Sequence, residues 1–570
     1  MVTVKRLYLY SVLAVSLALL VAGITDVVRL VLDGVSGIFG TQTLVGSGFA
    51  REDFSRALAL VIIGAPLWGF HAWLVRRAVS GPTDAADDER ASAARATYFF
   101  VVLVVTLAVA CSALIEAIAT GVRLEPGDGF WGSGTLPVAL VVGTTWVLHA
   151  RWRGRDLRLA PAHTADDWLT RAYLYGVLFV SAILALYQVS DLITVLGRSA
   201  LAVRPVFASG EWLRDAAAGP IAGSLVLGAV WVSHWFMAGR LMRADDPMGA
   251  AHRTSRTRVA YLLGTVAACA GITLVLLSSS LRDLLSDVVL ARNSIAGRTR
   301  LIEDIGGPVL ATIPFVMAWW WHVRRSSREA LALIGPARQR AVVRTGRLIV
   351  AAVGLVGLSA GLAWGVSAAI DLIEVRLDSD LILGSILRGR GAEAFAAATI
   401  GLVMWLPAWI LLQRERAVAA IEVARSTARR AYLVGVSGVA VIAAMIAGAW
   451  LIYQVTRILL DAGRPDDTSW AIGVLTAAGL GLAYHLFELR ADARIVHRDT
   501  SAEDVLEPTP SPAGTSVESP PVPDSSALSM PTESIEIIGP PGADWDVVNA
   551  SIRERLPAGY VLRVTATDGA

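Results

Sequence analysis

Histidines at a recurring position are the residues of this chain best suited to chemistry within an apolar segment. In the complete copies, a tryptophan precedes the histidine by three residues and an arginine follows it by six. Four copies are complete: Trp68–His71–Arg77, Trp146–His149–Arg155, Trp231–His234–Arg240 and Trp319–His322–Arg328. A fifth copy has Ala408 in place of histidine, and a sixth keeps His485 without the tryptophan. Successive copies lie 78, 85, 88, 86 and 77 residues apart, which predicts a tandem repeat.

An imidazole inside an apolar helix could relay protons, bind a cation or ligate haem. Haem b would need two histidines facing each other across a helical bundle. The structural alternative assigns the tryptophan and arginine to the aromatic belt and positive anchor of a membrane helix. Each histidine would then hydrogen-bond the neighbouring helix and set the geometry of the pair. Because nearly every copy carries the histidine, the pattern favours packing over one dedicated site.

Acidic residues form a second, weaker series of Asp26, Glu116 and Asp191. Each follows the arginine that opens its apolar segment by 20 or 21 residues, which is about 30 Å along a helix. This spacing predicts polar helix ends at the outer membrane interface, with a ring of carboxylates in a vestibule as the alternative.

Known enzymatic motifs do not indicate an activity for this sequence. It has no phosphate-binding glycine loop with Lys-Ser/Thr, no His-Glu-x-x-His and no Gly-x-Ser-x-Gly. The two cysteines, Cys111 and Cys269, both lie in apolar segments. We therefore expect no catalytic residue, no metal site and no cofactor.

The elements that must position the motif are long apolar segments, since 55% of the 570 residues are hydrophobic and 17% charged. Their lengths fit membrane spans, and they predict an all-α integral membrane protein of about twelve transmembrane helices in six hairpins. The first helix of each hairpin is predicted at 7–32, 97–121, 172–197, 259–290, 348–373 and 431–459. The second, which carries the motif near its end, is predicted at 57–75, 136–150, 220–239, 307–323, 395–413 and 470–489.

Two further patterns concern the first helices. Most open with an arginine and a tyrosine-bearing turn, as in Arg171 with Tyr173, and Arg95 with Tyr98 and Arg258 with Tyr261 are looser versions. Gly357, Gly361 and Gly365 form a stripe of small residues that predicts close packing between helices.

Orientation and boundaries follow from the connections. The five links between hairpins hold 26 lysines and arginines, about twice the number in the links within hairpins, which predicts cytoplasmic termini in the inner (plasma) membrane. The predicted hairpins occupy residues 1–80, 81–158, 159–245, 246–332, 333–418 and 419–498.

The remaining chain has a different composition. Residues 499–533 are rich in Pro, Ser and Glu and predict a disordered linker. Residues 534–570 predict a small cytoplasmic βαβ-like module or a partly ordered tail, which could bind a cytoplasmic protein. With a net charge of +2, the chain shows no signal for nucleic acid, and the lipid bilayer is its expected partner.

The stretches RAYLYGVLFVSAILALYQVSDLI (171–193) and GSLVLGAVWVSHWFMAGR (223–240) carry a resemblance. They resemble the bacterial multi-pass membrane family catalogued as domain of unknown function 5671, as do RLYLYSVLAVSLALLVAGITDVV and APLWGFHAWLVRR. The resemblance spans nearly all of 1–490 and weakens in the fifth copy. It implies a multi-pass architecture and assigns no activity.

Three functions remain open from the sequence. The first is a structural, scaffold-like or binding membrane protein without catalysis. The second is a transporter or channel-like protein that uses the intramembrane histidines and acidic residues. The third is a haem or quinone membrane protein.

Overall fold

The computed structural model describes residues 2–38, 47–123, 134–159, 168–201, 211–289, 305–333, 335–375, 387–460 and 468–506. Every regular element in these ranges is helical, and no strand occurs in them. Long, mostly apolar stretches favour helices here, because a helix satisfies its own backbone hydrogen bonds where water is absent.

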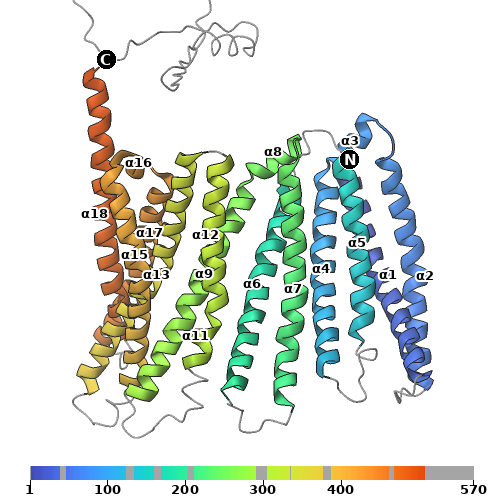
Figure 1. Cartoon of the computed structure of the whole chain (residues 1–570), viewed down its shortest axis with the longest axis horizontal. Helices are drawn as coiled ribbons and strands as arrows, with labels where there is room; N and C mark the ends of the chain where they lie inside the picture. Colours follow the sequence, from blue (N-terminus) through green and yellow to red (C-terminus); the bar gives the residue numbers. More distant parts are fainter. Residues whose placement is uncertain are drawn as a thin grey trace, which may run out of the picture. The chain divides into compact units, whose positions relative to one another are not determined.

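Consecutive long helices form six pairs (Figure 1). These are α1 (Val2–Ile38) with α2 (Ser47–Ala78), α4 (Ala93–Arg123) with α5 (Thr135–Leu159), α6 (Trp168–Ala200) with α7 (Trp212–Arg243), α9 (Arg256–Asp283) with α12 (Ile313–Leu333), α13 (Pro336–Val375) with α15 (Ala392–Val418), and α17 (Thr427–Leu459) with α18 (Ser469–Leu506). Shorter turns η2 (Leu284–Val289), α11 (Gly307–Ala311) and η4 (Leu387–Gly391) lie within the fourth and fifth pairs.

Ten helices in the described residues are long and apolar enough to cross a membrane. They do not include α5 and α12, whose C-terminal halves carry charged side chains such as Arg151 and Arg325. The predicted number of twelve spans therefore stays a prediction.

Large apolar side chains also lie exposed on the outer faces of these helices, among them Ile62, Val180 and Ile442. An exterior of this kind suits a lipid environment and would be costly in water.

Three short helices connect pairs at one end of the helices in Figure 1: α3 (Asp84–Arg90), α8 (Pro247–Arg253) and α16 (Ala420–Ala424). The first two links close in the same way. Arg90 donates to the carbonyls of Val79 and Gly81, and Arg253 donates to those of Met242 and Ala244. Each of these two connecting helices is thereby held to the end of the preceding pair.

Neighbouring pairs also pack against one another. Helix α1 contacts α4 and α5, α4 contacts α6 and α7, α9 contacts α6, α13 and α15, and α13 contacts α17. Buried apolar clusters fill these contacts, one around Leu13 and Phe99 and another around Leu178 and Leu262. The apolar core is thus shared between pairs.

The glycine stripe of α13 packs closely against α15, as its spacing predicts. A Cβ added at Gly361 would overlap the backbone of Ala398, and one added at Gly401 would overlap the backbone of Leu358. At Gly354 it would lie 2.5 Å from the backbone nitrogen of Trp405. Only glycine permits this separation between the two helices.

The chain divides into two compact units, Met1–Val505 and Leu506–Ala570. Helix α18 continues to Leu506. The rest of the predicted linker, and the predicted βαβ-like module at 534–570, lie outside the described residues.

Candidate functional site

Four motif histidines make the same two hydrogen bonds. In His149, Nδ1 lies 2.8 Å from the carbonyl oxygen of Thr145, one turn earlier, and Nε2 lies 3.0 Å from the hydroxyl of Tyr98 on α4. The same contacts join His234 to Val230 and Tyr173, His322 to Ala318 and Tyr261, and His485 to Gly481 and Tyr432. The packing interpretation predicted a hydrogen bond to the first helix of the pair, and it is present in these four copies.

These contacts fix the proton positions on the histidine ring. A carbonyl oxygen only accepts, so Nδ1 carries the proton and donates it to the backbone. In the neutral ring, Nε2 is then the acceptor, and the tyrosine hydroxyl donates to it. All four rings are buried, so neither nitrogen is left for another ligand.

A tryptophan from the preceding pair completes the arrangement. Trp146 on α5 donates through Nε1 to the Tyr173 hydroxyl oxygen on α6 at 2.9 Å. Trp231 on α7 likewise donates to Tyr261 on α9 at 3.1 Å. The result is a directed hydrogen-bonded series, tryptophan to tyrosine to histidine to backbone carbonyl, that crosses three helices. We call it the Trp–Tyr–His chain.

Two other tryptophans hold the equivalent position in the motif. Trp68 packs against the cluster that contains Tyr98, and Trp405 packs against the cluster that contains Tyr432. Their Nε1 atoms are buried without a hydrogen bond in the described part of the chain. The packing of the series is therefore retained there, although its first hydrogen bond is not.

The first and fifth copies of the motif depart from this pattern. His71 bonds the carbonyl of Leu67 at 2.8 Å and meets the Tyr8 ring edge-on, with centroids 6.0 Å apart. In the fifth copy the histidine position holds Ala408 and the tyrosine position holds Arg347. Both members of the hydrogen-bonded pair are therefore missing together.

In four of the six pairs, a second polar contact lies about two helical turns after the histidine position, towards the end of the helix. An arginine three residues before the tyrosine position pairs with a carboxylate seven residues after the histidine position. The pairs are Arg95–Asp156 at 2.5 Å, Arg258–Glu329 at 2.6 Å, Arg344–Glu415 at 2.7 Å and Arg429–Asp492 at 2.7 Å. Arg95 and Arg429 have 0% exposed side chains, so each removes a full charge from solvent and needs its partner.

The fifth-pair arginine also reaches the connecting helix. Arg344 binds Glu422 of α16 at 2.8 Å, and this hydrogen bond lowers the pKa of the Glu422 carboxyl. By contrast, the carboxylate positions of the first and third pairs hold Ala78 and Leu241.

The acidic partners were missed by the sequence reasoning. Asp156, Glu329, Glu415 and Asp492 each follow the histidine position by seven residues, a spacing that places them on the same helix face. Aligning the copies on the histidine and extending the motif by one residue beyond its arginine would have found them.

The arginines of the predicted motif lie elsewhere. Arg77, Arg155, Arg240 and Arg328 are all exposed, away from the buried histidines of their helices. The structure therefore brings together the tryptophans and histidines of successive copies and leaves these arginines outside.

The predicted outer acids lie on three different helices, and no contact joins them within the described residues. Asp26 lies 3.3 Å from Arg56 of α2, and Glu116 lies 3.5 Å from Arg123 of its own helix. Asp191 is exposed on α6.

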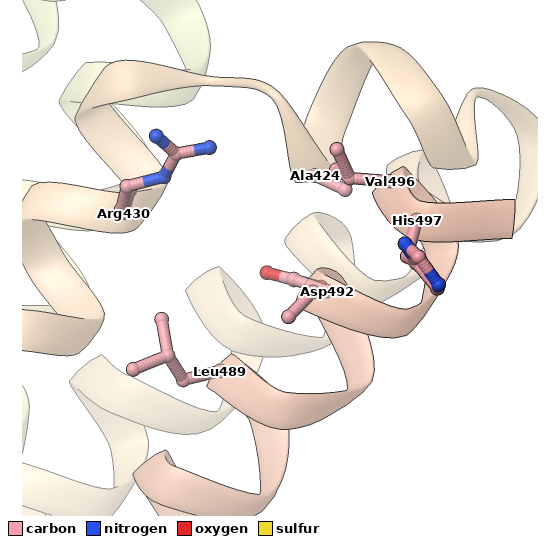
Figure 2. A pocket seen from close by; sticks show the side chains of 7 residues that line it. Ala424, Arg430, Leu489, Asp492, Val496 and His497 are labelled. Carbon is pink, nitrogen blue, oxygen red and sulfur yellow. The ribbon is translucent and has the colours of Figure 1, made fainter. Parts of the chain in front are cut away.

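A pocket of about 360 Å³ lies beside the Arg429–Asp492 pair, lined by residues of α16, α17 and α18 (Figure 2). Arg430 of α17 lies across it from Asp492 and His497 of α18. The Asp492 carboxylate is already bound by Arg429 and by Arg416 at 2.9 Å. Among the described residues, no group of three or more His, Cys, Asp or Glu could hold a metal ion.

In its described residues, the protein is an all-helical membrane protein with a repeated buried polar contact. Residues 6–130 and 344–483 match the model of the family described as domain of unknown function (DUF5671). Each matched segment contains a pair of long helices, a short connecting helix and a third long helix. No curated protein and no solved structure matches the chain.

Proposed function

We propose that this chain is a membrane-embedded scaffold without catalytic activity, built from six tandem copies of one helical hairpin. The observation that carries the proposal is the occupation of both ring nitrogens in His149, His234, His322 and His485. A histidine that ligates haem or a cation needs one nitrogen free, and a proton relay needs one that can change partners.

The position of the Trp–Tyr–His chain supports the same role. In each full copy the tyrosine lies between a tryptophan of the preceding pair and a histidine of its own pair. Hydrogen bonds between membrane helices contribute about 0.6 kcal/mol on average and up to about 1.7 kcal/mol. Repetition of the contact would fix the order and depth of successive hairpins, which is what a scaffold requires.

The Arg–carboxylate pairs add to this specificity. Buried ion pairs contribute little net stability compared with apolar packing, but a mispaired charge is costly. Arg95 and Arg429 would thus penalise any register other than the one that brings Asp156 and Asp492 to them.

We further propose that twelve helices span the inner membrane and that both termini of the chain lie on its cytoplasmic side. The excess of Lys and Arg in the links between hairpins supports this orientation. Reporter fusions after residue 498 test it: activity of a cytoplasmic reporter is expected, and activity of a periplasmic one would overturn it. Residues beyond α18 would then present a binding module to a cytoplasmic protein partner.

The thermal stability of detergent-purified protein tests the scaffold role. His234→Ala removes one buried hydrogen-bonded ring and should lower the melting temperature. Arg240→Ala, at an exposed site on the same helix, should leave it unchanged. An unchanged melting temperature in His234→Ala, or a Soret band in the absorbance spectrum of the wild-type protein, would count against the proposal.

A further inference from the structure

A groove on α5 differs from the corresponding surfaces of the other motif helices. Its volume is about 450 Å³. Its lining divides along the helix axis into an apolar part and a basic part. The apolar part is Trp146, Val147 and Ala150, and the basic part is Arg151, Arg155 and Arg158, with Gly154 between the arginines.

The three arginines are exposed and have no carboxylate partner within the described residues. The acid on this stretch of α5, Asp156, is turned away to Arg95. A Cβ added at Gly154 would meet nothing within 4 Å, so the glycine leaves open space between the basic side chains. Within the described part of the chain, the groove thus has three positive charges and no compensating negative charge.

Arg151 occupies a position that is otherwise mostly apolar. Two residues after the histidine position, four other motif helices have exposed apolar side chains: Trp73, Phe236, Ile410 and Phe487. The remaining helix, α12, has Arg324, which lies 4.0 Å over the ring of Trp320 one turn earlier. Arg151 has Val147 at that place and gains no such contact.

The depth of Arg151 makes an unpaired charge costly there. In the proposed membrane placement it lies about 6 Å deeper than Arg155, at 1.5 Å per residue. An arginine at the level of exposed apolar side chains needs an anionic partner or must extend to the interface. Arginine at all three positions, two, six and nine residues after the histidine, occurs in α5 and in no other motif helix of this sequence.

We propose that this groove binds an anionic phospholipid. Its phosphate headgroup would lie among Arg151, Arg155 and Arg158, and an acyl chain would lie along Val147 and Ala150. Arginine suits this ligand because its guanidinium donates two parallel hydrogen bonds to phosphate oxygens. Basic pockets beside membrane helices recognise anionic headgroups by this chemistry. The inference rests on the proposed membrane placement and is independent of the Trp–Tyr–His chain.

Native mass spectrometry of the full chain in detergent, titrated with phosphatidylglycerol, tests the proposal. The variant R151Q/R155Q/R158Q should bind this lipid at least tenfold more weakly than wild type. Phosphatidylcholine should bind weakly and equally to both proteins. The matched control R240Q/R243Q, which alters the two corresponding arginines of α7, should change phosphatidylglycerol binding less than twofold.

Several results would overturn the proposal. Equal phosphatidylglycerol binding by the triple variant and wild type would do so, as would an equal loss in the α7 control. Inorganic phosphate that displaces the lipid at equal concentration would show a site for free phosphate instead. If the triple variant does not fold, R155Q alone should weaken binding at least threefold, and an unchanged affinity would contradict the assignment. The Arg→Gln variants should keep the thermal stability of the wild type in lipid-free detergent. Weaker lipid binding by these variants then reports on the groove alone and is independent of the scaffold proposal.

Discussion

The α6–α7 and α13–α15 pairs join two long helices by different means. In α6–α7, Tyr173 and His234 meet across the pair at 3.4 Å, and Trp146 reaches Tyr173 from the preceding pair. In α13–α15, these positions hold Arg347 and Ala408, and glycines bring the two backbones into contact. One pair relies on a hydrogen bond between bulky polar rings, the other on the absence of side chains.

This difference explains why the tyrosine and the histidine are both absent from the α13–α15 pair. A buried tyrosine or histidine without its partner would leave a polar group unsatisfied, at a cost of about 1–3 kcal/mol. Close approach of α13 and α15 also leaves little room for two rings. The α13–α15 pair instead retains the Arg344–Glu415 contact, for which α6–α7 has no counterpart because Leu241 occupies the carboxylate position.

The largest effect is expected for Gly361→Leu in α13. Its side chain would overlap the backbone of α15 at Ala398, so the helices must separate, at about 3 kcal/mol or more. Gly435→Leu in α17 is the control, because a Cβ there meets nothing within 4 Å. Thermal unfolding in detergent measures both, and equal melting temperatures for the two variants would refute close backbone contact as the basis of this pair.

The second-largest loss of stability is expected for Arg344→Met in α13. It leaves Glu415, whose side chain is 18% exposed, without its main partner, and we expect a loss of about 2–3 kcal/mol. Arg340→Met is the matched control, since Arg340 is half-exposed and 3.5 Å from Glu422, and exposed pairs contribute under about 1 kcal/mol. If both variants unfold at the same denaturant concentration, the buried pair has no special role in α13–α15.

A smaller loss is expected when the hydrogen-bonded pair is introduced into α13–α15. Ala408→His should destabilise by about 1–3 kcal/mol, because the added ring overfills a closely packed site. The double variant R347Y/A408H should recover little of this loss, since both rings must fit between helices held together by glycine. Full recovery of the melting temperature would show that the two modes of joining are interchangeable.

Much of the fold could be predicted because apolar length and motif spacing are local properties. The predicted segments 7–32, 97–121 and 172–197 lie within α1, α4 and α6. The close packing at Gly361 followed from spacing alone. The last helix was predicted to end at 489 but continues to Leu506, because charged residues beyond an apolar span can extend a helix outside the membrane.

The candidate site could be predicted only in part. Tryptophan and histidine were identified by their three-residue spacing, whereas their tyrosine partner lies 51 to 61 residues from the histidine. That separation varies with the length of the link, so no fixed interval marks the contact. The hydrogen bond from Trp146 to Tyr173 also joins two different pairs. The hydrophobic period of one helix does not specify how neighbouring pairs pack.

A double-mutant cycle on Tyr173 and His234 tests the central claim most directly. Tyr173→Phe, His234→Ala and the double variant would be compared with wild type by reversible unfolding in detergent. The Trp–Tyr–His chain predicts a coupling energy of about 1 kcal/mol. A control cycle of His234→Ala with Tyr261→Phe should give coupling near zero, because Tyr261 bonds His322 instead. Additive effects in the Tyr173–His234 cycle would contradict the account.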